Sequence, residues 1–138
     1  MLRLAAYLQF ALAIAHLLVL PWLNEAFQIY GIGKLMGHIA AYGAYWPYLI
    51  TIIIAGCFAL GGLYAISACG RIRRLPLLWT GIFFIAFVFI ARALMGAYWM
   101  YSSHNFDFTS LSSVLIAGFI GLLCLVGGIK QLKPQIRN

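Results

Sequence analysis

Two ionisable side chains, His16 and Arg92, interrupt long apolar stretches of the sequence. An ionised group inside a membrane span is costly unless it is paired, hydrated or able to reach the interface, so such residues are candidates for function. Gln9 lies seven residues before His16 and Trp99 seven residues after Arg92, so each shares a helix face with its ionisable neighbour. These four residues predict a polar ligand site with Arg92 as a fixed cation and His16 as a titratable partner. An anionic or quinone-like head group would suit it.

A structural interpretation of the same residues stays open. Arg92 can extend its side chain to the membrane interface and stack on an aromatic ring, while His16 can fix helix register through one hydrogen bond. The substitution Arg92→Leu separates the two interpretations. Loss of ligand binding would support the ligand site, and unchanged binding with altered stability would support the structural role.

A second group of polar residues lies between the apolar stretches and comprises Glu25, Lys34, His38, His104 and Asp107. Two histidines and two carboxylates have the chemistry for a metal site or for acid–base catalysis. They come from different segments and lack the HxxxH or HExxH spacing that places two ligands on one helix face. We therefore expect solvated interface residues, with no metal site and no bound cofactor.

The composition excludes a soluble domain. Of 138 residues, 65% are hydrophobic and 8% are charged, and the mean hydropathy is +1.01, whereas soluble domains carry about 25% charged residues. The surrounding solvent must therefore be lipid. The net charge of +7 does not indicate nucleic-acid binding, because the basic residues lie between apolar stretches rather than on one soluble face. The three cysteines form no CxxC pair, which predicts small packing residues.

Four segments are long enough to cross the hydrocarbon core as helices, which requires roughly 20 apolar residues each. They are residues 4–23, 47–68, 76–100 and 111–129. Pro47 suits the first turn of the second span, and the Ser/Thr cluster at 109–113 suits the cap of the fourth. The segment 24–46 predicts a short interfacial helix or a partly ordered connector. We expect an all-α integral membrane four-helix bundle forming one domain over residues 1–138.

Lysine and arginine residues predict the orientation of this bundle. On one side of the expected spans lies Lys34 alone, and on the other lie Arg3, Arg71, Arg73, Arg74, Lys130, Lys133 and Arg137. Because positive residues concentrate on the cytoplasmic side, we expect both termini in the cytoplasm of a bacterial inner membrane. His16 and Arg92 then lie about 4 to 6 Å to the outer side of the midplane, at depths that allow them to meet in an outward-facing pocket. A signal peptide cleaved near Ala15 is the alternative for the first span.

Small residues predict where the helices approach closely. Ala117, Gly121 and Gly128 belong to a stripe of small residues on the fourth span, and Gly62 belongs to a similar stripe on the second. We expect these two spans to be close-packing partners. The same stripes suit a dimer interface, since glycine-lined faces serve contacts within and between chains alike.

The stretch Gly61-Gly62-Leu63-Tyr64-Ala65, followed by Arg71-Ile72-Arg73-Arg74-Leu75-Pro76-Leu77-Leu78, resembles the second-to-third-span junction of small four-span proteins of the bacterial inner membrane, including uncharacterised families. The layout also resembles that of the DoxX-like group, in which a short basic loop joins the middle spans. The second span here lacks the acidic residue expected of that group. Small multidrug transporters are similar in size, but that resemblance implies a Glu in the first span, which this chain lacks. No site residue follows from these resemblances.

The scarcity of chemical motifs and the small-residue stripes predict a non-enzymatic accessory or interaction protein. It would pack, among membrane lipids, against further copies as a homo-oligomer or against a larger membrane complex. The alternative is a binder or carrier of a small amphipathic ligand, such as a lipid or quinone, at His16, Arg92, Gln9 and Trp99. A membrane enzyme is the third interpretation.

Overall fold

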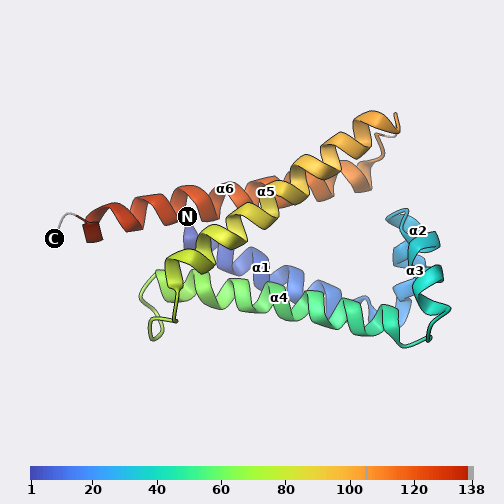
Figure 1. Cartoon of the computed structure of the whole chain (residues 1–138), viewed down its shortest axis with the longest axis horizontal. Helices are drawn as coiled ribbons and strands as arrows, with labels where there is room; N and C mark the ends of the chain where they lie inside the picture. Colours follow the sequence, from blue (N-terminus) through green and yellow to red (C-terminus); the bar gives the residue numbers. More distant parts are fainter. Residues whose placement is uncertain (105, 137–138) are drawn as a thin grey trace.

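The computed structural model describes residues 1–104 and 106–136, with side chains up to residue 132. Every regular element in this part of the chain is helical, as the sequence predicts. Two short helices, a 3₁₀ turn and four long helices make up the fold (Figure 1). In chain order they are α1 (Leu2–Leu18), η1 (Leu20–Trp22), α2 (Leu23–Ile29), α3 (Gly33–Ala40), α4 (Trp46–Ala68), α5 (Leu78–Ser102) and α6 (Phe108–Ile136).

Three helices are long and apolar enough to cross a membrane, namely α4, α5 and the Phe108–Leu132 part of α6. Helix α1 passes the same test only together with its bent continuation through Ile29. The described chain therefore has three such helices, or four if the bent pair forms one span. Helices of this kind indicate a membrane protein.

The first helix ends earlier than the sequence predicts. We expected a continuous span over residues 4–23, but α1 ends at Leu18 and the next helical segment is inclined to it by 53°. Pro21 explains the break, because it lacks an N–H group and its ring clashes with a carbonyl one turn earlier in a continuing helix. The turn η1, with Pro21 near its start, takes the place of the last expected turn.

The other helix starts follow local chemistry. Helix α4 begins at Trp46 with Pro47 in its first turn, as predicted, and α3 is a short helix in the 24–46 segment, one of the two alternatives that the sequence left open there. The cap of α6 differs from the prediction, because the helix begins at Phe108 and the Ser/Thr cluster lies inside it. Asp107 caps this helix instead, with its Oδ2 accepting a hydrogen bond of 3.1 Å from the Ser110 N–H.

The four long helices form two antiparallel pairs, α1 with α4 and α5 with α6. Figure 1 shows that the pairs converge where the N-terminus and the α4–α5 loop lie, which we call the terminal end. They diverge toward α2, α3 and the α5–α6 loop, which we call the cap end. The predicted partnership of the second and fourth spans is wrong, since α4 packs mainly on α1 and α6 mainly on α5.

The core occupies the region where the pairs converge. Apolar side chains from three helices bury one another there, namely Ala5, Ala86, Phe89, Ala117, Ile120, Leu123 and Cys124. A second buried cluster joins Leu2, Ala6, Ala65 and Ile82. Alanine and glycine allow the backbones to approach closely, which supplies the van der Waals contact that holds helices together in lipid.

The α4–α5 loop is tied to the end of α4 by the buried Ser67. Its hydroxyl donates to the Arg73 carbonyl at 3.1 Å and accepts from the Leu75 N–H at 3.0 Å. The Tyr64 hydroxyl also donates to the Pro76 carbonyl at 3.3 Å. These bonds hold the start of α5 beside the end of α4, so the two pairs stay together at the terminal end.

Candidate functional site

Gln9 lies at the junction of three helices and is fully buried. Its Nε2 donates to Cys124 Sγ on α6 at 3.5 Å, and its Oε1 lies against Gly61 on α4, in the space that a Cβ would fill. Among the described residues, Oε1 has no hydrogen-bond partner. Gln9 therefore joins α1 to both α4 and α6, and its amide fits there because residue 61 is glycine.

His16 lies two turns further along the same face of α1 and is half-buried. Its Nδ1 lies 2.8 Å from the Leu12 carbonyl, so Nδ1 carries the proton and donates it. The ring is tilted against Phe58 of α4 with the centroids 5.0 Å apart. One hydrogen bond and one ring contact orient this histidine, and its Nε2 remains for another partner.

Arg92 is exposed on α5, and its Nη2 donates to Ser113 Oγ of α6 at 3.3 Å. A Cβ on Gly96 would lie 2.9 Å from Arg92 Nη1 and 2.7 Å from Val114 Cγ2. Because residue 96 is glycine, the Arg92 guanidinium can lie over its backbone. Side chains on a helix usually lean toward its N-terminus, whereas this one is directed one turn toward the cap end.

The helical register shows which way Arg92 faces. Gly81, Ile85, Arg92 and Trp99 follow one another at spacings of four and seven, so they share one face of α5. Near the terminal end this face contacts the other pair, since Gly81 lies against Tyr64 and Ile85 lies near Gly61. Toward the cap end the same face is uncovered, and Trp99 is 72% exposed.

His16 and Arg92 therefore lie on opposite pairs, and each has a different partner. Phe58, whose ring contacts His16, also meets the ring of Phe89 on α5 across the two pairs, with centroids 5.7 Å apart. Gln9 and Arg92 thus lie in separate environments, because Gln9 is buried among three helices and Arg92 is exposed. Trp99 lies with Arg92 on the open face.

The four predicted packing residues lie in contacts within the chain. Gly62 lies against the Phe10 ring, Gly121 against Phe89 and Ile90, and Gly128 against Ile82. Ala117 is buried in the core cluster. The small-residue stripe of α6 is thus used largely in packing against α5.

The second polar group remains dispersed. Among residues 1–104 and 106–136, no three His, Cys, Asp or Glu side chains lie close enough together to hold a metal ion. Glu25, Lys34, His38 and His104 are exposed. The His104 ring contacts Tyr101, and the hydrogen bonds from Ser110 to Asp107 lower the pKa of the Asp107 carboxyl below the ordinary 3.8.

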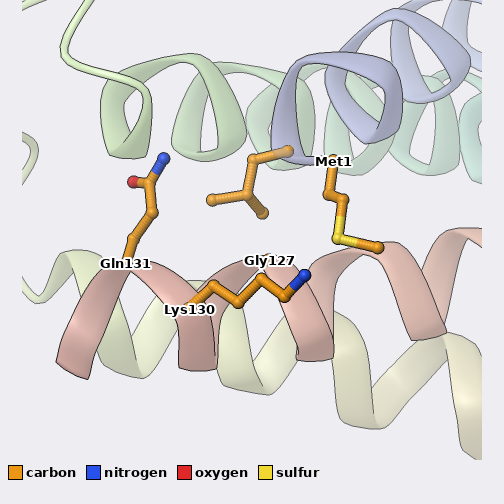
Figure 2. Close-up of a pocket in the computed structure, with 5 residues that line it drawn as sticks. Met1, Gly127, Lys130 and Gln131 are labelled. Atoms are coloured by element: carbon orange, nitrogen blue, oxygen red, sulfur yellow. The ribbon is translucent and has the colours of Figure 1, made fainter.

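A small open cavity of about 190 Å³ lies at the terminal end, between the start of α1 and α6 (Figure 2). It is lined by Met1, Leu2, Gly127, Lys130 and Gln131. Figure 2 shows the Lys130 side chain extended along α6 toward Met1, and the Gln131 amide directed away from α6. None of the four predicted ligand residues lines this cavity.

Sequence reasoning connected neither Ser113 nor Phe58 with the ionisable residues, and it placed Gly96 on the face of Arg92 without predicting that the guanidinium lies over it. Gly96 gave a signal, because it follows Arg92 by one turn and makes room for a long side chain. Ser113 belongs to the small-residue stripe, and nothing in its spacing relates it to Arg92 on another helix. Phe58 gave no signal among the many phenylalanines of the spans.

Comparison with family models, with curated proteins and with solved structures finds no match to this chain. Its function must therefore be inferred from the geometry of its own residues.

Proposed function

We propose that this chain binds a small amphipathic molecule with an anionic head group, between the two helix pairs at the level of Arg92. One observation carries this proposal. The face of α5 that packs on the other pair at the terminal end is uncovered at Arg92, where a permanent cation has a neutral hydroxyl as its hydrogen-bond partner. An uncompensated cation at that depth is costly, and a bound anion offsets the cost.

The geometry of the guanidinium suits an oxyanion. Arginine presents five N–H donors in a planar fork that matches carboxylate and phosphate, and the bond to Ser113 occupies one of them. Ser113 accepts that bond through its oxygen, which leaves its hydroxyl proton for a bound oxygen. A quinone carbonyl would accept the same bonds but would leave the positive charge unbalanced.

We further propose that both termini face the cytoplasm of a bacterial inner membrane, so that the cap end lies outside. In support, the exposed basic side chains Arg3, Arg71, Arg73, Arg74 and Lys130 belong to segments at the terminal end. The side chain of Lys133 and the residue Arg137 lie outside the described part. Both acidic residues, Glu25 and Asp107, belong to segments at the cap end. Reporter fusions at each terminus and in the 24–46 segment would test this orientation.

The binding proposal is tested by gentle extraction of the tagged full chain and native mass spectrometry. We expect the protein to carry a small amphipathic anion in near-stoichiometric amount. The variant Arg92→Gln should lose it while retaining its thermal stability. An identical set of bound molecules in the wild type and in Arg92→Gln would contradict the proposal.

A second candidate is an accessory subunit or homo-oligomer that packs laterally against the cap-end part of α5, where Trp99 lies on the uncovered face and Tyr98 and Tyr101 lie on the face of Leu94. The exposed aromatic side chains of α5 at the cap end, including Tyr98, Trp99 and Tyr101, favour it, since a partner helix would bury them. The same extraction distinguishes the candidates. A stoichiometric larger membrane protein, or a defined oligomer lost on Trp99→Ala, would support the accessory subunit instead of the ligand binder.

A further inference from the structure

Building on the proposed function, we infer that the ligand is a long-chain carboxylate that enters sideways from the outer leaflet, with its carboxylate on Arg92 and Ser113. A soluble carboxylate has the same head group as a long-chain carboxylate. The two differ in the route by which they reach Arg92, from water or from lipid, and three features of the fold define this route.

Depth is the first feature. Arg92 lies ten residues before the end of α5 at Ser102, which places its Cα about 15 Å along the helix from that end. A phospholipid head group remains at the interface, and drawing a bulky phosphodiester to this depth is costly. A compact carboxylate on a single chain can reach the guanidinium while its tail remains in hydrocarbon.

The position of α2 and α3 is the second feature. In Figure 1 these helices stand at the cap end between the ends of the two pairs. They contact each other, and α3 also contacts α4, so the cap is attached to the α1·α4 pair. The cap lies on the side from which a solute in water would approach, whereas the flanks of the divergence face lipid.

The walls of the divergence are the third feature. The rings of Phe58 on α4 and Phe89 on α5 meet across the two pairs, and Met95 and Trp99 line the open face of α5 with exposed fractions of 66% and 72%. Phe58, Phe89, Met95 and Trp99 are all apolar or aromatic. Such walls suit an acyl chain and offer few hydrogen bonds to a small hydrated anion.

The test uses the full chain in phosphatidylcholine nanodiscs, with Trp22, Trp46 and Trp79 replaced by Phe so that Trp99 is the fluorescent reporter. Brominated stearate is the probe, because bromine quenches tryptophan at short range. We expect saturable quenching that excess acetate does not reverse. The brominated alcohol of equal chain length, which lacks the charge, should bind at least about tenfold more weakly.

A matched variant separates a built site from general attraction to positive charge. Leu94 lies on the opposite face of α5 at nearly the same depth and is 67% exposed. The double variant Arg92→Gln with Leu94→Arg therefore keeps the charge and its depth but moves it away from Ser113. We expect it to weaken the saturable quenching by about tenfold.

Each outcome has a definite meaning. Equal quenching by the acid in the double variant would overturn the assignment to Arg92 and, with it, the proposed binding function. Competition by acetate as strong as by stearate would overturn lateral entry from lipid but leave an anion site at Arg92 standing. Equal binding of acid and alcohol would overturn the carboxylate as the recognised group.

Discussion

The two ends of the molecule treat polar side chains in opposite ways. At the terminal end, the amide of Gln9 is enclosed by three helices and lies against a glycine. Toward the cap end, Arg92 lies on the same face that packs elsewhere, yet its side chain is exposed. Polarity within an apolar helix therefore does not by itself indicate function. A polar group that a neighbouring helix encloses, such as Gln9, is a structural residue. A polar group that the neighbouring pair leaves exposed, such as Arg92, is a candidate ligand residue.

The largest expected effect tests the closed end. Leucine at position 61 would occupy the space of the Gln9 amide, so Gly61→Leu should lower the free energy of unfolding by about 3 kcal/mol or prevent folding. Thermal unfolding in detergent measures this. Gly56→Leu on the same helix is the control, because Gly56 is exposed and a Cβ there would meet nothing within 4 Å. Similar losses for both variants would contradict the closed packing at Gly61.

Substitution of Gln9 sharpens the comparison, because size and polarity can be varied separately. Gln9→Ala should cost about 2 kcal/mol of stability by leaving a cavity among α1, α4 and α6. Gln9→Leu should change stability by less than about 1 kcal/mol, since it fills the space and removes the unpartnered Oε1. Equal losses for Leu and Ala would mean that the hydrogen bond from the Gln9 amide to Cys124 outweighs the filling of the space.

At the open end, Ser113→Ala should affect binding rather than folding. The hydroxyl holds the guanidinium from the side of α6, so its removal should weaken stearate binding by about threefold to tenfold. The unfolding temperature should remain within error, because the bond is exposed. A drop in stability with unchanged binding would assign Ser113 to packing.

The smallest effect concerns the cap of α6. Because the pKa of Asp107 is lowered in the folded chain, its cap is fully present above pH 3.8 and is lost as the pH falls through the folded pKa. Hydrogen exchange at the Ser110 amide should therefore become faster, relative to its intrinsic rate, at acidic pH. Asp107→Asn should remove this dependence, and equal acid sensitivity in that variant would contradict it.

Hydrophobic length predicted most of the fold. The helical class, the second to fourth spans and the short helix α3 follow from apolar runs and from Pro47, because lipid permits few alternatives to a helix. The break of the first helix at Val19 could also have been predicted, since Pro21 lies in the expected first span. The pairing of helices was not, because small residues indicate that a face packs closely without indicating which helix it meets.

The candidate site was predictable in its residues but not in their arrangement. His16 and Arg92 stand out in the sequence because ionisable groups are rare in the spans. Their separation onto two diverging pairs depends on Gly81 and Ile85 meeting α4 while Arg92 does not, and this difference arises from the angle between the pairs. No local pattern encodes that angle.

The order of the chain connections determines which segments can fix the distance between the two helix pairs at the cap end. The segment 69–77 is the connection between the pairs, and Ser67 ties it down at the terminal end. Both other turns join helices within a pair, so no covalent bond of the described chain spans the cap end. The two helix pairs can therefore rotate relative to each other about a hinge at the 69–77 connection. The part of α5 from Ile85 to Ser102 is about 25 Å long. Each degree of rotation about the hinge therefore moves Ser102 by about 0.4 Å.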